Sequence, residues 1–353
     1  MILYTPHNPD EALDNVLHNF AADDAQPEPS RNGPVLRAPV PVCTTWTPRH
    51  CSVSLSPVRD ANPFFHLFEA CWMLAGRNDV EFLAQYNARM AEFSDDGDVL
   101  HGAYGFRWRE WFNFDQLKEL VSELRRNRAT RRAVLTMWSP EGDITQAEGV
   151  SSGGLRGKDI PCNTQAYFSI RGGALDMTLM ARSNDAVWGA YGANIVHFGL
   201  LHGWMAWAAG VPLGVLYQIS NDLHIYAERP DVVKLREYAA AHPYESLGRP
   251  AILVTGLPPE PHLGGRADTP MDFLAACEDF CEGDFTGAAH KSLFMDETVI
   301  PMALAHQAHK AGARSSAESV LNAEGNLWHY AALAWLRRRW AAQDAKAAEG
   351  GAA

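Results

Sequence analysis

Three segments in the middle of this 353-residue chain hold side chains that can carry out covalent chemistry. A cysteine thiolate is a nucleophile, an arginine beside a serine can bind an anionic group, and a carboxamide can read the edge of a ring. Together these groups suit attack on a nucleotide base whose phosphate is bound nearby. The residues, in chain order, are Cys162 in KDIPCNTQAYF, Arg182, Ser183 and Asn194 in ARSNDAVWGAYGANIVHF, and His224 and Tyr226 in SNDLHIY.

Each of these residues, taken alone, also has an ordinary structural explanation. Cys162 can be a buried core thiol, and Asn194 can cap the helix that follows it. His224 and Tyr226 can be satisfied polar groups of the core. The chemical interpretation therefore depends on all of them occurring together, in one order.

That order resembles the thymidylate synthase family, which includes the phage pyrimidine hydroxymethylases, over roughly residues 30–230. The family nucleophile follows a proline, as Cys162 does here, and the family segment R-S-x-D-x-x-x-G matches residues 182–189. Further matches are E-x-x-W-x-x-x-G at Glu69, Trp72 and Gly76, Y-G-x-x-W at Tyr104, Gly105 and Trp108, R-R at Arg131 and Arg132, and H-x-Y at His224 and Tyr226.

The resemblance implies that Cys162 attacks carbon 6 of a uracil ring, which turns carbon 5 into an enolate carbon that can take a one-carbon unit. A thiol needs a cationic neighbourhood to lose its proton, and Arg182 is the expected source. Arg182 with Ser183 is also the first candidate for binding the phosphate, because a guanidinium offers forked donors.

Three more arginines are candidates for phosphate binding. Arg31 is the candidate match for the N-terminal phosphate loop of the family, with the nearby Arg37 as the alternative register. Arg131 and Arg132 match a pair that reaches the site of the partner subunit in a homodimer. The run RRNRATRR that contains this pair is equally typical of a solvated surface.

The remaining expected roles concern the base and the sugar. Asn194 can donate to O4 and accept from N3–H of uracil, so it is expected to select the base, and His224 and Tyr226 are expected to meet the ribose hydroxyl. Glu69 is expected to organise water and proton transfers from a buried, aromatic setting, although a lone helical Glu is normally solvated. One residue more than the synthase pattern precedes Asn194, which predicts a bulge there.

A one-carbon transfer needs a donor, and the resemblance implies 5,10-methylenetetrahydrofolate as the co-substrate, without a metal. Asp185 is expected to contact the pterin and Arg59 its glutamate tail, with Trp72 in the same folate site. The expected catalytic residues are Cys162, Glu69, Tyr104, Asp185 and Asn194.

Three departures from the synthase pattern bear on the product. Asn163 follows the nucleophile where synthases usually have His, Met90 and Phe93 replace the W-x-x-W tryptophans, and the short apolar C-terminal tail is missing. Synthases use that tail and those tryptophans to keep water away from the exocyclic methylene until folate delivers hydride. Without them, water is expected to attack and leave a hydroxymethyl group.

The sequence therefore predicts a one-carbon transferase that converts dUMP to 5-hydroxymethyl-dUMP for phage DNA modification. A thymidylate synthase making dTMP and a hydroxymethylase acting on dCMP or CMP remain alternatives. A catalytically silent nucleotide-binding homologue is another, and the presence of both Cys162 and Glu69 counts against it.

Composition limits the partners and the location. The net charge of −12 argues against binding to nucleic-acid backbone but permits a small anionic ligand. No stretch resembles a signal peptide or a membrane span, and the six cysteines lack disulfide or zinc spacing. A cytoplasmic enzyme with reduced cysteines is expected, in the host cytoplasm if a phage encodes it.

The elements that must position these residues follow an α+β pattern. Helices are expected at 62–75, 115–128 and 193–209, the last without a charged residue, and strands at 131–138, 164–181 and 215–219, with a hairpin turn at Gly172-Gly173. This order predicts a thymidylate-synthase-like mixed sheet packed with helices. The catalytic domain is expected over 1–260, and 261–353 as a helical C-terminal extension packed on it.

Overall fold

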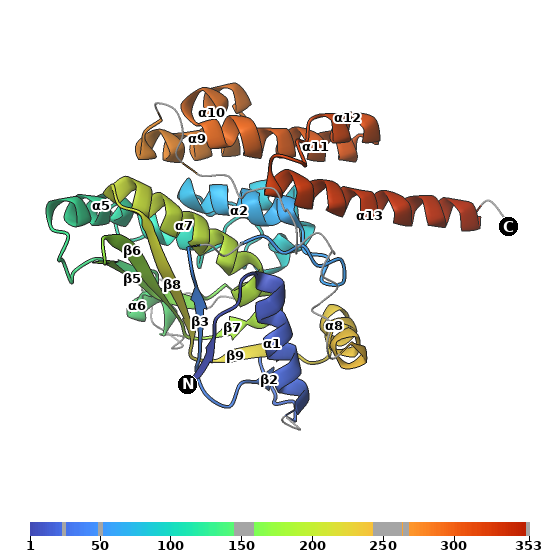
Figure 1. Cartoon of the computed structure of the whole chain (residues 1–353), viewed down its shortest axis with the longest axis horizontal. Coiled ribbons are helices and arrows are strands. Elements are labelled where there is room, and N and C mark those ends of the chain that lie inside the picture. Colours follow the sequence, from blue (N-terminus) through green and yellow to red (C-terminus); the bar gives the residue numbers. More distant parts are fainter. Residues whose placement is uncertain (23–25, 49–51, 145–158, 243–262, 264–267, 351–353) are drawn as a thin grey trace.

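The computed structural model describes residues 1–22, 26–48, 52–144, 159–242, 263 and 268–350. Within these ranges the protein has the predicted α+β architecture, with a mixed sheet covered by helices (Figure 1). The domain boundary expected at residue 260 lies outside the described residues. In the part of the chain that is described, no helix is long and apolar enough to cross a bilayer.

A six-stranded sheet forms the centre of the molecule, in the order β1-β3-β8-β6-β5-β4. Pairs β1–β3 and β8–β6 are parallel, and the other neighbours are antiparallel. The strands are β1 (Ile2–Tyr4), β3 (Val42–Trp46), β4 (Val134–Thr136), β5 (Asn163–Arg171), β6 (Ala174–Ala181) and β8 (Leu213–Ser220).

The hairpin of β5 and β6 turns at Gly172-Gly173, as predicted. Both glycines have positive φ, 57° and 85°, which is the conformation that a two-residue hairpin turn favours and that glycine adopts most easily. The turn sets the register of the whole hairpin, apart from a bulge near its open end. There the Arg182 amide donates to the Cys162 carbonyl at 2.9 Å, so the hairpin places the candidate nucleophile and the candidate cation side by side.

A smaller sheet collects other candidate residues. It contains β2 (Val35–Arg37), β9 (Leu223–Tyr226) and β7 (Asn184–Asp185), with β9 in the middle. Parallel pairing of β7 with β9 puts Asp185 opposite His224. Antiparallel pairing of β2 with β9 brings the segment around Arg31, just before β2, to the same place.

Two buried helices cross behind the site. The helix α7 (Asn194–Ala209) has no charged residue, packs on β6 and β8, and ends at Gly210 in the left-handed conformation. The helix α2 (Pro63–Leu74) begins at Asn62, whose side chain accepts hydrogen bonds from the amides of Phe64 and Phe65. Both helices match the predicted ranges within about two residues, the usual variation of helix ends.

All residues of α2 are buried because different neighbours cover its two sides. One side faces α7, and the other lies under the C-terminal helices (Figure 1). Phe64 packs on Trp335 and Phe68 on Phe280, with ring centroids 5.6 and 5.2 Å apart. The C-terminal helices are α9 (Pro270–Glu282), α10 (Phe285–Lys291), α11 (Ile300–Lys310), α12 (Arg314–Ser319) and α13 (Leu327–Gly350).

The helix α13 begins over α2 and extends past the rest of the molecule (Figure 1). Its Arg338 and Arg339 bind Asp60, which has a φ of 56° in the turn before α2. The remaining helices are α1 (Pro9–Ala22), α3 (Val80–Ala84), α4 (Tyr104–Arg109), α5 (Gln116–Arg126), α6 (Pro140–Asp143) and α8 (Pro230–Ala241).

Candidate active site

Cys162 sits directly before β5 and is the half-buried cysteine of the described chain. Cys43, Cys71, Cys277 and Cys281 are free and buried, as expected for reduced core cysteines. Burial raises the pKa of the Cys162 thiol, and the nearby Arg182 and Arg31 guanidinium groups oppose that rise without cancelling it. The thiol thus lies in a cationic neighbourhood, which favours the thiolate form that attacks.

Arg182 holds the segment that carries the nucleophile. Its Nε donates to the Pro161 carbonyl at 3.0 Å and its Nη2 to the Ile160 carbonyl at 3.2 Å. The guanidinium carbon lies 5.4 Å from the centre of the Trp138 ring, which supports it from the side. Ser183 follows directly, half-buried, in the bend between β6 and β7.

Residues of the smaller sheet lie beside the same thiol. The rings of His224 and Tyr226 are 5.3 Å apart on one face of β9, because residues two apart along a strand point to the same side. Burial raises the pKa of Tyr226, whose surroundings include the charges of Asp185 and Cys162. Burial also raises the pKa of the Asp185 carboxyl, against the influence of His224 and Arg229.

Asn194 begins α7 immediately after a π-helix at Ala186–Ala193. A π-helix turn contains one residue more than an α-helical turn, which is how the chain accommodates the insertion expected before Asn194. The Asn194 side-chain NH₂ donates to the Asn184 oxygen at 3.2 Å, and the Asn184 NH₂ donates to Ser220 at 3.0 Å. These bonds hold the Asn194 amide while leaving its own oxygen for another partner.

Tyr104 links the nucleophile segment to the helices. Its hydroxyl accepts a hydrogen bond from the Asn163 amide at 3.2 Å, and burial raises its pKa. The next residue, Gly105, is close to the backbone of Met73 on α2, where a Cβ atom would lie only 1.9 Å from the Met73 carbonyl oxygen. The glycine of the Y-G-x-x-W motif is therefore needed for α4 to approach α2.

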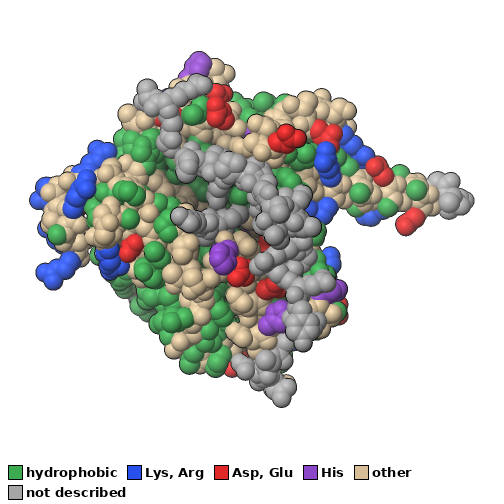
Figure 2. All heavy atoms as spheres, in the orientation of Figure 1, with side chains coloured by type: hydrophobic (Ala, Val, Ile, Leu, Met, Phe, Trp, Pro, Cys, Tyr) green, Lys and Arg blue, Asp and Glu red, His purple; other side chains and the backbone are tan. Residues whose placement is uncertain are grey.

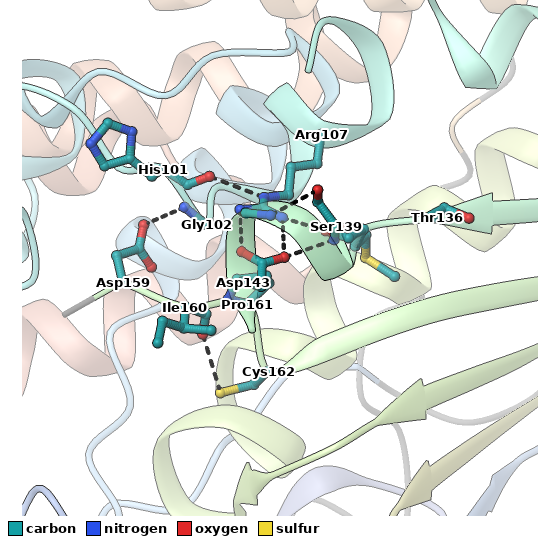
Figure 3. Close-up of polar contacts among 12 residues, drawn as sticks. His101, Gly102, Arg107, Thr136, Ser139, Asp143, Asp159, Ile160, Pro161 and Cys162 are labelled. Atoms are coloured by element: carbon teal, nitrogen blue, oxygen red, sulfur yellow. Dashed lines mark hydrogen bonds and ion pairs between the residues drawn. The ribbon is translucent and has the colours of Figure 1, made fainter. Parts of the chain in front are cut away.

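A buried ion pair of Arg107 and Asp143 is drawn near the nucleophile segment (Figure 3). Arg107 donates to both oxygens of Asp143, at 2.6 and 2.9 Å, and to the carbonyls of His101 and Met137. Beside it, Asp159 accepts a hydrogen bond from the Gly102 amide at 2.7 Å, and burial raises the pKa of this carboxyl.

Glu69 lies on α2 with its carboxyl buried against α7, in the setting expected for it. His197 of α7 faces it, with the His197 Nε2 and Glu69 Oε2 atoms 3.0 Å apart. Of the two residues that stand where synthases have the W-x-x-W tryptophans, Met90 is buried and Phe93 is 39% exposed.

Two residues expected to bind folate have other partners. The Arg59 guanidinium is buried and donates to the Val187 carbonyl of the π-helix at 2.5 Å, so it points inward. The buried Trp72 donates its indole N–H to Asp79 at 3.2 Å, which holds the start of α3. Both side chains thus bond to protein groups, and their contacts with folate remain a prediction.

The pair Arg131 and Arg132 is exposed just before the edge strand β4. Other residues around the site were not anticipated from the sequence, namely Asn32, Asn184, Asp159, His197 and Arg229. Helical spacing after Asn194 would have pointed to His197, and proximity to Cys162 in the sequence to Asp159.

Several known proteins are similar to this chain. The thymidylate synthase domain family matches residues 53–247, which is more than half of the chain. A deoxyuridylate hydroxymethyltransferase of Pseudomonas phage M6 is 40% identical over 348 residues, covering 97% of this chain and 95% of that protein. A protein of the same name from Bacillus phage SP01 is 39% identical over 180 residues, 48% of this chain and 45% of that protein. The crystal structure of thymidylate synthase from T4 phage has a TM-score of 0.49 and 19% identity, covering 63% of this chain and 78% of that one.

Proposed function

This chain belongs to the thymidylate synthase family of one-carbon transferases, and we propose that it converts dUMP to 5-hydroxymethyl-dUMP with 5,10-methylenetetrahydrofolate as the second substrate. One observation carries the choice of product. The phage relative that matches 97% of this chain at 40% identity is named a deoxyuridylate hydroxymethyltransferase. The proposed substrates are cytoplasmic metabolites, so the cytoplasm is the proposed compartment.

The proposed nucleotide site uses residues that the fold brings around Cys162. Arg182, Ser183 and Arg31 bind the phosphate, and the Arg182 and Arg31 charges favour the thiolate form of Cys162. His224 and Tyr226 bind the ribose from β9.

Base selection rests on Asn194. Because its NH₂ group already donates one hydrogen to Asn184, the oxygen and the second hydrogen remain for N3–H and O4 of uracil. Cytosine offers an acceptor at N3 and a donor at position 4, so it would leave polar groups unpaired at roughly 1–3 kcal/mol each.

The proposed chemistry begins with attack of the Cys162 sulfur on carbon 6. Carbon 5 then bonds to the one-carbon unit, loses its proton, and expels tetrahydrofolate to leave an exocyclic methylene. Water adds to this methylene, and departure of the Cys162 thiolate restores the ring. Asp185, at the π-helix start, is the proposed contact of the pterin.

The experiment is a competition among dUMP, dCMP and CMP with methylenetetrahydrofolate, followed by mass spectrometry of the nucleotides. The proposal expects 5-hydroxymethyl-dUMP as the main product and a preference for dUMP in kcat/KM. A main product of dTMP would identify a thymidylate synthase, and preference for dCMP or CMP would show that Asn194 does not read the base.

The same proposal includes a homodimer formed through the open face of the large sheet. Alternate residues of neighbouring strands stand half-exposed on this face, and the pairing places them in rows. Figure 2 shows hydrophobic side chains gathered on the lower left of the molecule, where Figure 1 draws these strands. One row consists of Thr45, Tyr217, Thr178, Tyr167 and Val134.

Arg131 and Arg132 are exposed before β4, the edge strand of this sheet, and are proposed to reach the phosphate in the partner's site. Mixing Cys162→Ala chains with Arg131→Ala chains tests the sharing of residues. Mixed dimers are expected to regain part of the activity that each variant lacks. Failure to regain any activity, with dimers present by light scattering, would contradict shared sites.

A further inference from the structure

A buried histidine, His197, faces the carboxyl group of Glu69 between α7 and α2. Its Nε2 atom is 3.0 Å from the Glu69 Oε2 atom, and the two side chains are 2% and 9% exposed. Within the described ranges, neither of these atoms nor His197 Nδ1 has an aligned hydrogen-bond partner. The protein therefore holds three buried polar atoms whose hydrogen-bonding capacity is unused.

Such atoms are costly to keep. A buried donor or acceptor without a partner costs roughly 1–3 kcal/mol, and native proteins retain few of them. A carboxyl and an imidazole only 3.0 Å apart leave no room between them, but they can bind one small polar molecule beside them. Their position decides what that molecule is.

Helical spacing places the pair on the side of α7 that carries the base-reading amide. Asn194 and His197 are three residues apart and so share one face of the helix. The next residue, Phe198, packs on Tyr104 with ring centroids 5.5 Å apart, and Tyr104 in turn bonds the Asn163 amide next to the nucleophile.

A second buried histidine, His66, lies near Glu69 and His197. His66 lies one turn before Glu69 on α2, and burial, with Arg59 and His197 nearby, lowers its pKa well below the ordinary value. His66 is therefore neutral at physiological pH. This leaves His197 as the group that faces Glu69 directly.

We propose that His197 is a positioning residue of the water-addition step, holding the Glu69 carboxylate so that it accepts a proton from the attacking water. This inference rests on the proposed hydroxymethyl transfer. A small rotation of either side chain aligns the two groups, so that His197 Nε2–H donates to one Glu69 oxygen and the other oxygen is directed to the water.

The step is balanced as follows. The water oxygen bonds to the exocyclic carbon, and the methylene electron pair moves into the ring to form the enolate at O4. The proton lost by the water goes to Glu69. Collapse of the enolate forms the double bond between carbons 5 and 6 and expels the Cys162 thiolate, which takes up a proton.

The test separates the steps before water addition from the steps after it. The hydrogen at carbon 5 leaves before the methylene forms, so tritium release from dUMP labelled at carbon 5 reports the early steps. Formation of 5-hydroxymethyl-dUMP reports capture by water. Both time courses are measured with enzyme in excess over dUMP, for wild type, His197→Phe, His197→Gln and His202→Gln.

His202→Gln is the matched control, because His202 is another buried histidine of α7 that bonds the Leu175 carbonyl of β6. In wild type and in this control, product is expected to follow tritium release. In His197→Phe, product is expected to lag tritium release by about a hundredfold, the lower end of what a positioned general base contributes. Intact-protein mass spectrometry should then show the nucleotide adduct of Cys162.

His197→Gln keeps a donor of similar reach and should recover part of the rate of product formation. If His197→Phe does not fold, His197→Asn, whose amide is too short to reach Glu69, carries the same comparison. Equal slowing of both time courses, or no lag, in the variant that lacks the donor would overturn the role of His197. Wild-type enzyme that releases tritium but forms dTMP would instead overturn the proposed function.

Discussion

The ion pair between Arg107 and Asp143 should be a large local determinant of stability. The two side chains are 0% and 1% exposed, and they are joined by two hydrogen bonds of 2.6 and 2.9 Å. The Ser139 amide donates to the same carboxylate at 2.7 Å. Asp143→Asn keeps the shape but removes the charge, so the Arg107 guanidinium is left buried without a counter-charge. Breaking a buried pair in this way costs about 3–5 kcal/mol.

Urea unfolding followed by tryptophan fluorescence measures this loss. Asp231→Asn is the matched control, because its partner Arg229 is 27% exposed and Asp231 is 50% exposed. Solvent screening limits such a pair to about 1 kcal/mol or less. If Asp143→Asn lowers the free energy of unfolding no more than this control does, the ion pair does not hold the segment around Ser139. The reasoning from burial would then be wrong.

Three further predictions concern the thiol and the C-terminal helix. Cys162→Ala should abolish product formation and retain dUMP binding by calorimetry, whereas turnover in this variant would contradict a covalent mechanism. Burial raises the pKa of Cys162 above the ordinary 9.0, so the rate of alkylation of the enzyme by iodoacetamide should keep rising into alkaline pH. Arg182→Gln should shift the pH midpoint of this rate further upward. A midpoint near neutral pH would contradict the prediction. Arg339→Ala removes the bidentate bond to Asp60 and the contact with the Trp335 ring at 3.6 Å, and should lower the free energy of unfolding by about 1–2 kcal/mol, with an unchanged urea midpoint as the contradicting result.

Local patterns were sufficient to predict the elements that carry the nucleophile and the base-reading amide. The position of the hairpin turn at Gly172-Gly173 follows from the sequence, whereas the bulge that adjusts the register near Cys162 and Arg182 was visible only in the structure. The extra residue before Asn194 likewise predicted a bulge, although not that it takes the form of a π-helix.

Contacts between elements that lie far apart in the sequence were harder to predict from it. The direction of Arg59 depends on the Val187 carbonyl, which lies 128 residues away in the sequence and is brought to Arg59 only by the fold. The contact of His197 with Glu69 depends on how α7 and α2 cross, and sequence spacing within one helix does not specify that crossing. Trp72 could be placed in the core from its apolar neighbours, but its bond to Asp79 required the fold.

The most direct test of the proposed water capture is a reaction of the wild-type enzyme with dUMP and methylenetetrahydrofolate in oxygen-18 water. The nucleotide and the folate are analysed together by mass spectrometry. Capture by water predicts 5-hydroxymethyl-dUMP with oxygen-18 in its new hydroxyl group, and an equal amount of tetrahydrofolate. Unlabelled dTMP with an equal amount of dihydrofolate would contradict it, because the methylene would then have been reduced by hydride in a site that excludes water.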